Sequence, residues 1–220
     1  MSILKLTNVN KIIKKRTILS EINLSLTKGN IYGLYGRNGS GKTMLIRTIA
    51  GLILPTSGEI EVFGKVLGRD ISFPESMGIT IENVGFWPKY TGFECLQLIA
   101  SIKKKANNQQ IATALDRVGL DPYDKRRFNQ YSLGMKQKLA IAQAIMEQPD
   151  LIMLDEPTNS LDEESIKNIR QLLLEEKERN ALIIIASHNK EDLKVLADKT
   201  YQLTDGCIQD YDIGDTNICS

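Results

Sequence analysis

Residues that commonly cluster in catalytic or metal sites are scarce in this sequence. It contains a single histidine, His188, and three cysteines, Cys95, Cys207 and Cys219. The cysteines are widely spaced and odd in number, so they form neither a metal-binding pattern nor a disulfide framework. Their pattern favours a reducing compartment such as the cytosol.

The sequence also lacks an excess of charge and a long apolar run. Lysine and arginine number 28 and aspartate and glutamate 27, which leaves a formal net charge of +1. Without a basic excess, nucleic acid is not an expected partner. The N-terminus does not read as a signal peptide, and no apolar run approaches the roughly 18 residues that cross a bilayer. We therefore expect one soluble domain over residues 1–220, long enough to bury a full core.

A phosphate-binding motif is present, in the setting that such a motif requires. Residues 36–43 match the P-loop pattern of a glycine, four free positions and Gly-Lys-Ser/Thr. The apolar run 31–35 predicts a buried strand before the loop, and residues 44–50 predict a helix after it. Glycines let backbone N–H groups turn toward a polyphosphate, and the helix points its positive end there. The loop residues expected to contact a nucleotide are Gly36, Asn38, Gly39, Ser40, Gly41, Lys42 and Thr43.

Charged and hydroxyl groups near this loop predict a metal-assisted phosphate site. Lys42 is expected to neutralise charge on the β- and γ-phosphates, and the Thr43 hydroxyl is expected to ligate Mg²⁺. Asp155 directly follows the wholly apolar run 151–154. From the end of a buried strand, its carboxylate is expected to reach the same Mg²⁺ ion.

Two further residues are candidates for the hydrolytic step. Glu156 follows Asp155 and is expected to face the γ-phosphate and to polarise an attacking water. His188 closes the second apolar run, 181–186, and is expected to donate a hydrogen bond to a γ-phosphate oxygen or to the water.

The hydrophobic patterns predict an α/β fold of the P-loop NTPase type with a mainly parallel sheet. Strands that are apolar throughout alternate with amphipathic helices, as in sheets covered on both faces. Residues 4–9 and 18–26 instead alternate apolar with polar, which predicts an N-terminal antiparallel β layer joined by a basic turn at 11–16. Residues 212–220 are expected to form a loose tail.

A helical subdomain is predicted between the two halves of the sheet. From residue 91 the apolar spacing changes to a helical period, and Ser132 is expected to cap the following helix. We place the core at 1–88 and 137–220 and the inserted α-helical subdomain at about 89–136.

These motifs together resemble the ATP-binding cassette (ABC) ATPases over nearly the whole chain. Residues 131–138, Tyr-Ser-Leu-Gly-Met-Lys-Gln-Lys, resemble the family signature and keep Ser132 and Gly134 of its Leu-Ser-Gly-Gly-Gln core. Residues 157–162 resemble the loop that follows the acidic pair, with Asp162 in the matching position. His188 resembles the switch histidine of the family.

The resemblance implies an ATPase that works as a dimer. Two cassettes would close head to tail and sandwich ATP, with Mg²⁺, between one P-loop and the partner's signature, so that Ser132 and Gly134 face the partner's γ-phosphate. A second copy of this chain is the expected partner cassette. A transmembrane permease subunit is the other expected partner, which would place the chain at the cytoplasmic face of the membrane.

Two positions depart from the usual family pattern. Glu82 stands where most members carry a glutamine that contacts Mg²⁺ and water. A glutamate there resembles the cassettes of bacitracin-resistance and lantibiotic-immunity transporters, which implies export of an antimicrobial peptide. Ile13 stands where most members carry an aromatic residue that stacks on adenine, and no Tyr, Phe or Trp precedes Tyr32.

ABC ATPases also include proteins with two other kinds of function. The first is a nucleotide-gated clamp on ribosomes or chromosomes; such members carry two cassettes or long coiled-coil insertions, and this chain has one cassette without a long heptad insertion. The second is a regulatory protein with little turnover, which the altered signature allows. Glu156 argues against it, because inactive cassettes typically lose that residue.

Overall fold

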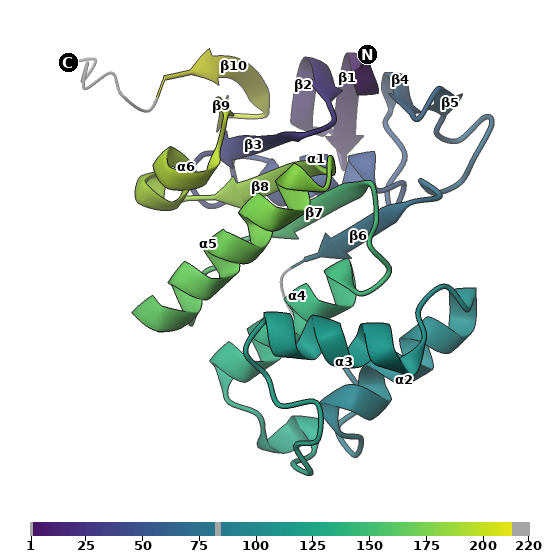
Figure 1. Cartoon of the computed structure of the whole chain (residues 1–220). Helices are drawn as coiled ribbons and strands as arrows, with labels where there is room; N and C mark the ends of the chain where they lie inside the picture. Colours follow the sequence, from purple (N-terminus) through teal and green to yellow (C-terminus); the bar gives the residue numbers. More distant parts are fainter. Residues whose placement is uncertain (1, 82–84, 213–220) are drawn as a thin grey trace.

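The computed structural model, which describes residues 2–81 and 85–212, confirms the predicted α/β fold (Figure 1). Two sheets form its framework, one of four strands and one of six. In the smaller sheet the order is β2 (Arg16–Thr27), β1 (Ser2–Ile13), β4 (Ser57–Val62) and β5 (Lys65–Val66). In the larger sheet the order is β10 (Cys207–Tyr211), β9 (Lys199–Thr204), β3 (Asn30–Tyr35), β8 (Leu182–Ser187), β7 (Leu151–Asp155) and β6 (Met77–Thr80).

The smaller sheet is antiparallel throughout, as the alternating N-terminal pattern predicts. The predicted basic turn at 11–16 was too long, because β1 continues to Ile13 and only Lys14 and Lys15 form the turn, with φ of 47° and 67°. The extra length is held across the sheet by hydrogen bonds from β1 to the segment before β4. Lys11 Nζ donates to the Leu54 carbonyl at 2.7 Å, and the Ile12 N–H donates to the Thr56 hydroxyl at 3.0 Å.

The larger sheet is parallel from β9 to β6, with β10 antiparallel at one edge. Strand β3 pairs with β8, and β8 pairs with β7, so the carboxyl ends of three strands meet at one edge. In this register Tyr35 lies opposite Ser187, and Asp155 lies opposite Ala186. The segment after each strand therefore starts from the same edge, where parallel sheets place their ligands.

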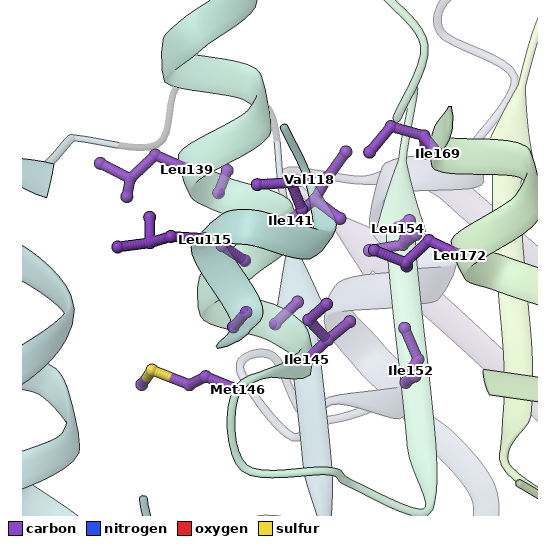
Figure 2. Close-up of a cluster of buried hydrophobic side chains, with 14 of the residues drawn as sticks. Leu115, Val118, Leu139, Ile141, Ile145, Met146, Ile152, Leu154, Ile169 and Leu172 are labelled. Atoms are coloured by element: carbon purple, nitrogen blue, oxygen red, sulfur yellow. The ribbon is translucent and has the colours of Figure 1, made fainter. Parts of the chain in front are cut away.

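Strand β7 is buried on both faces, which explains its wholly apolar sequence. Ile152 and Leu154 lie on the face covered by α4 (Leu133–Ile145) and α5 (Glu163–Glu178). Figure 2 shows them between Ile145 of α4 and Leu172 of α5. The alternate residues of β7, Leu151 and Met153, belong to a second cluster of buried hydrophobic side chains, which includes residues of α1 (Lys42–Ile49).

The end of the molecule far from β10 is helical (Figure 1). It contains α2 (Gly92–Lys103), α3 (Asn108–Arg117) and the short 3₁₀ helix η1 (Phe128–Gln130). Helix α4 runs from this region into the core and packs against β6. The Ser132 side chain accepts the Met135 N–H at 3.2 Å, which confirms the predicted cap. Helix α6 (Lys190–Leu196) and the strands β5, β9 and β10 were not assigned from the sequence. The subdomain limits stay a prediction, and most of the predicted tail lies outside the described residues.

The contact between β6 and α4 depends on a glycine, which gives a test of the fold. A Cβ at Gly78 would lie 1.8 Å from the Ala144 carbonyl oxygen and 3.0 Å from Pro149 Cγ. Gly78→Ala is therefore expected to lower the free energy of unfolding by about 1–3 kcal/mol, because backbone must move to admit the methyl group. Urea denaturation measures the change.

Gly85→Ala is the matched control, because a Cβ at Gly85 meets nothing within 4 Å. Equal stabilities of the two variants would contradict the close packing of β6 on α4.

Candidate nucleotide site

A cavity of about 380 Å³ opens where the loop after β3 meets the end of β7. Its walls come from the start of β2, the P-loop, the first turn of α1 and the acidic pair after β7. The lining residues are Ile18, Asn38, Gly39, Gly41, Lys42, Thr43, Met44, Asp155 and Glu156. The structure thus brings together, in one cavity, residues from three separate parts of the chain.

The backbone of the P-loop fits a polyphosphate. Gly39 and Gly41 have φ of +82° and +110°, which residues with a Cβ rarely adopt. A Cβ at Gly36 would lie 2.5 Å from the Ser40 hydroxyl oxygen and 2.6 Å from the Leu203 carbonyl oxygen. Gly41 also serves as the N-cap of α1 and supplies no side-chain acceptor for the first N–H groups of that helix. Those N–H groups and the helix dipole favour an anion beside Gly41.

Lys42 carries the positive charge of the cavity and is 5% exposed. Its Nζ donates to the Gly36 carbonyl at 2.7 Å and to the Arg37 carbonyl at 3.3 Å. The Glu156 carboxylate lies 3.9 Å away. The ammonium group is thus folded over the loop that would cradle the phosphates, and phosphate oxygens would replace carbonyl oxygens as its acceptors.

Thr43 and Asp155 form a pair suited to a magnesium ion. The Thr43 hydroxyl donates to Asp155 Oδ2 at 2.6 Å, and Asp155 is 4% exposed. In the described part of the chain, no group of three or more His, Cys, Asp or Glu residues is arranged to hold a metal. A hydroxyl and one carboxylate fit Mg²⁺, because that ion commonly takes its remaining ligands from substrate phosphates and water.

Glu156 and His188 contact each other directly. Glu156 Oε1 lies 2.8 Å from His188 Nδ1 and accepts the His188 backbone N–H at 3.0 Å. The other carboxylate oxygen accepts the Ser187 hydroxyl at 3.3 Å. Glu156 is 5% exposed, whereas the His188 side chain is 51% exposed. Of the three predicted residues, Lys42 and Glu156 therefore line the cavity, and His188 reaches the site through its contact with Glu156.

The predicted nucleotide-binding residues of the signature-like segment and of the loop before α5 do not line this cavity. Ser132 instead caps α4, and Asp162 caps α5. A hydrogen bond from the Ser165 hydroxyl lowers the pKa of the Asp162 carboxyl group. A Cβ at Gly134 would lie 2.8 Å from the Ser160 carbonyl oxygen, so the signature-like segment lies against the loop before α5. Glu82 lies outside the described residues, and its predicted contact with Mg²⁺ stays a prediction.

The wall nearest β2 is the part of the site that sequence reasoning missed. Ile18 lines the cavity, whereas the predicted Ile13 ends β1 beside the turn and is 38% exposed. The even-numbered alternation of β2 gave no signal for Ile18, because buried Leu19 and the left-handed φ of 49° at Glu21 shift that pattern before Ile22. Only the meeting of β2 with the P-loop places Ile18 at the cavity.

The comparisons with known proteins agree with this geometry. A family model described as ABC transporter matches residues 19–159. The ABC transporter ATP-binding protein YybJ of Bacillus subtilis (strain 168) is 47% identical over 94% of each chain. The bacitracin transport ATP-binding protein BcrA of Enterococcus faecalis is 38% identical over 89% of this chain, which spans 64% of that relative. The solved dimeric structure of MJ0796, a bacterial ABC transporter cassette, shares the fold with a TM-score of 0.87 at 24% identity, covering 96% of this chain and 99% of that one.

Removing the buried ammonium tests the phosphate site. Lys42→Ala is expected to weaken ATP binding at least tenfold, about 1.4 kcal/mol, because a buried polyphosphate would lose its main cation. Isothermal titration calorimetry measures the affinity. Lys65→Ala serves as control, since Lys65 pairs with Glu75 on the surface. Equal affinities of the wild type and Lys42→Ala would contradict the assignment of the cavity.

Base selectivity tests the β2 side of the cavity. With aliphatic Ile18 at the cavity wall and aliphatic Ile13 at the end of β1, no aromatic ring is offered to the base, and GTP is expected to compete with ATP to within about tenfold. Ile13→Tyr is expected to improve ATP binding by about 0.5–1.5 kcal/mol if its ring stacks on the base. Ile12→Tyr, on the opposite face of β1, is the matched control. A strong native preference for ATP would show that another group recognises adenine.

Proposed function

This chain belongs to the family of ABC transporter ATP-binding proteins, and on that premise we propose that its P-loop cavity is the hydrolytic site that powers export of an antimicrobial peptide. As a member it is an ATP-binding subunit and an ATPase. The observation that carries the site assignment is the meeting of Lys42, Asp155 and Glu156, from two strand ends, in one cavity.

Binding of ATP follows from the charges of the cavity. The P-loop N–H groups and Lys42 would hold the β- and γ-phosphates. In the structure Lys42 lies 3.9 Å from Glu156 and donates to two loop carbonyls. Phosphate oxygens entering between them would draw the ammonium group away from Glu156 and leave that carboxylate beside the γ-phosphate.

Glu156 is the proposed general base. As a water oxygen attacks the γ-phosphorus, Glu156 would accept the water proton, while the bond between phosphorus and the ADP oxygen breaks. His188 Nδ1 lies 2.8 Å from the Glu156 carboxylate and would orient it. Because its ring is half exposed, His188 can also turn toward the γ-phosphate.

Thr43 and Asp155 are the proposed Mg²⁺ ligands, with Glu82 as a further candidate from the sequence. Mg²⁺ held there would supply positive charge that stabilises a bound triphosphate. The 2.6 Å hydrogen bond between Thr43 and Asp155 holds both oxygen ligands on the same side of the cavity. Asp155 and Glu156 place two carboxylates beside a polyphosphate, so a divalent cation would also relieve their mutual repulsion.

A head-to-tail homodimer is the proposed working form. Ser132, Gly134 and Asp162 lie away from the cavity of their own chain, so a second copy would have to supply them to it. The cassette MJ0796, which has this fold, was solved as a dimer, and that supports the proposal.

The proposed substrate is an antimicrobial peptide, and the proposed partner is a membrane permease. Support comes from the relative BcrA, whose name assigns it to bacitracin transport. In the described residues, no helix is long and apolar enough to span a membrane. Membership of the transporter family therefore leads us to propose that a separate permease binds this chain at the cytoplasmic face of the membrane.

Glu156→Gln tests the catalytic assignment. The amide keeps the shape of the side chain but does not accept the water proton, so kcat is expected to fall by at least about 100-fold. The Kd for ATP is expected to stay within about threefold, and an ATP-held dimer should accumulate in light scattering. Phosphate release measures turnover, and Glu75→Gln on the surface is the control.

Full turnover in Glu156→Gln would remove Glu156 from the catalytic role.

For the transport proposal, deletion of the chain should sensitise its host to bacitracin-like peptides. Wild-type protein should restore resistance, and Glu156→Gln should not. Unchanged sensitivity on deletion would contradict the peptide substrate.

A further inference from the structure

A polar cluster outside the cavity lining joins three elements through one buried carboxylate. Asp192 of α6 is 2% exposed. Its Oδ2 accepts the Thr158 hydroxyl at 2.6 Å, and its Oδ1 accepts Arg170 Nη2 of α5 at 2.5 Å. None of these three residues lines the nucleotide cavity described above.

This cluster fastens together the two loops that carry the proposed catalytic pair. The loop after β7 contains Glu156 and Thr158, and the segment after β8 contains His188 and Asp192. The loops meet at Glu156 and His188, whose side chains are 2.8 Å apart, and again at Thr158 and Asp192. Glu156 and Thr158 are close in sequence on the first loop, and His188 and Asp192 are close in sequence on the second. The contact between Thr158 and Asp192 therefore restrains the relative position of the two loops where Glu156 meets His188.

The backbone at Glu156 needs such a support. Its φ of 50° lies in the left-handed region, which is unfavourable for a residue with a Cβ and persists only where neighbours hold it. On the strand side, the Glu156 N–H donates to the Ala186 carbonyl at 2.8 Å. On the loop side, its carbonyl accepts Asn159 N–H and Gln137 Nε2, both at 3.2 Å. Thr158 lies within this turn, so its anchor to Asp192 restrains the same backbone.

We propose that Asp192 and Thr158 form a positioning tie that holds Glu156 in its reactive orientation, with Arg170 holding the other oxygen of the Asp192 carboxylate in place. Neither residue of the tie touches the substrate; both act through the backbone of the loop. This inference rests on the proposed catalytic role of Glu156. It assigns a role in turnover to residues that the sequence motifs did not single out.

Arg170 makes the tie sensitive to substitution. Its Nε is buried without a hydrogen-bond partner in the described part of the chain, so its guanidinium depends strongly on Asp192. Removal of Asp192 would leave a partly buried guanidinium and the buried Thr158 hydroxyl without this partner, which endangers folding. Thr158 is therefore the better position for substitution.

Thr158→Val and Thr158→Ser are the informative pair. Valine keeps the shape of threonine but loses the hydroxyl, whereas serine keeps the hydroxyl. In wild-type background, Thr158→Val is expected to lower kcat at least about tenfold with KM for ATP within about twofold. Thr158→Ser is expected to keep kcat within about threefold of the wild type.

Glu176→Gln is the matched control for a buried polar cluster. Glu176 of α5 is 1% exposed and accepts Arg117 at 2.5 Å and Arg179 at 2.8 Å, but lies outside the cavity lining. It is expected to leave kcat within about twofold. Thermal unfolding of all variants gives the folded fraction to which each rate is normalised.

The lone histidine supplies a spectroscopic readout. His188 is the single histidine of the chain, so protein without a histidine tag gives one set of imidazole signals in ¹H NMR. Those signals are expected to shift in Thr158→Val and to stay in place in Thr158→Ser and Glu176→Gln.

The possible outcomes distinguish failure of the proposed tie from failure of the proposed hydrolytic site. Inactive wild type, or full turnover in Glu156→Gln, contradicts the proposed hydrolytic site. Active wild type and inactive Glu156→Gln, with unchanged kcat and imidazole signals in Thr158→Val, overturn the tie while leaving that site intact. Equal loss of kcat in Thr158→Val and Thr158→Ser, or in Glu176→Gln, also overturns it.

Discussion

Parallel pairing of β3, β8 and β7 is the constraint on which this molecule depends. Because the strands run the same way, their carboxyl ends share one edge of the sheet. The P-loop, the acidic pair and His188 each follow one of those ends. Apolar burial on both faces of β7 and β8 fixes the strands, and the fixed strands place side chains that are more than a hundred residues apart in sequence.

The electrostatics of the cavity explain why it suits a polyphosphate with a cation. Lys42 and the start of α1 provide positive potential, while Asp155 and Glu156 provide two carboxylates in the same cavity, with Glu156 3.9 Å from the Lys42 ammonium group. In the structure, Lys42 donates to loop carbonyls and Glu156 contacts His188, so both buried charges have polar partners. A triphosphate bound with Mg²⁺ would exchange these partners for phosphate and metal contacts without requiring a different fold.

The polar residues around the catalytic loop divide into two kinds. Ser132 and Asp162 cap helices, yet in the proposed dimer they also face the nucleotide of the partner. Thr158 and Asp192 face inward and join the loop to α6. A helix cap leaves a side chain at the surface and stabilises its own helix, so both uses are compatible at one residue. The buried side chains of Thr158 and Asp192 contact each other, so they can act only within their own chain.

The sequence by itself determined the chemistry of the site and the class of fold. Glycine spacing at 36–43 and a carboxylate pair after a wholly apolar strand identify a phosphate site through local patterns, because backbone conformation and burial impose them residue by residue. The tertiary structure decided what local pattern does not encode: Ile18 at the cavity wall, the contact between Glu156 and His188, and the tie between Thr158 and Asp192. The reason is that isoleucine, threonine and aspartate are ordinary on a strand, a loop or a helix, and they gain a role only from the neighbours that the folded sheet brings to them.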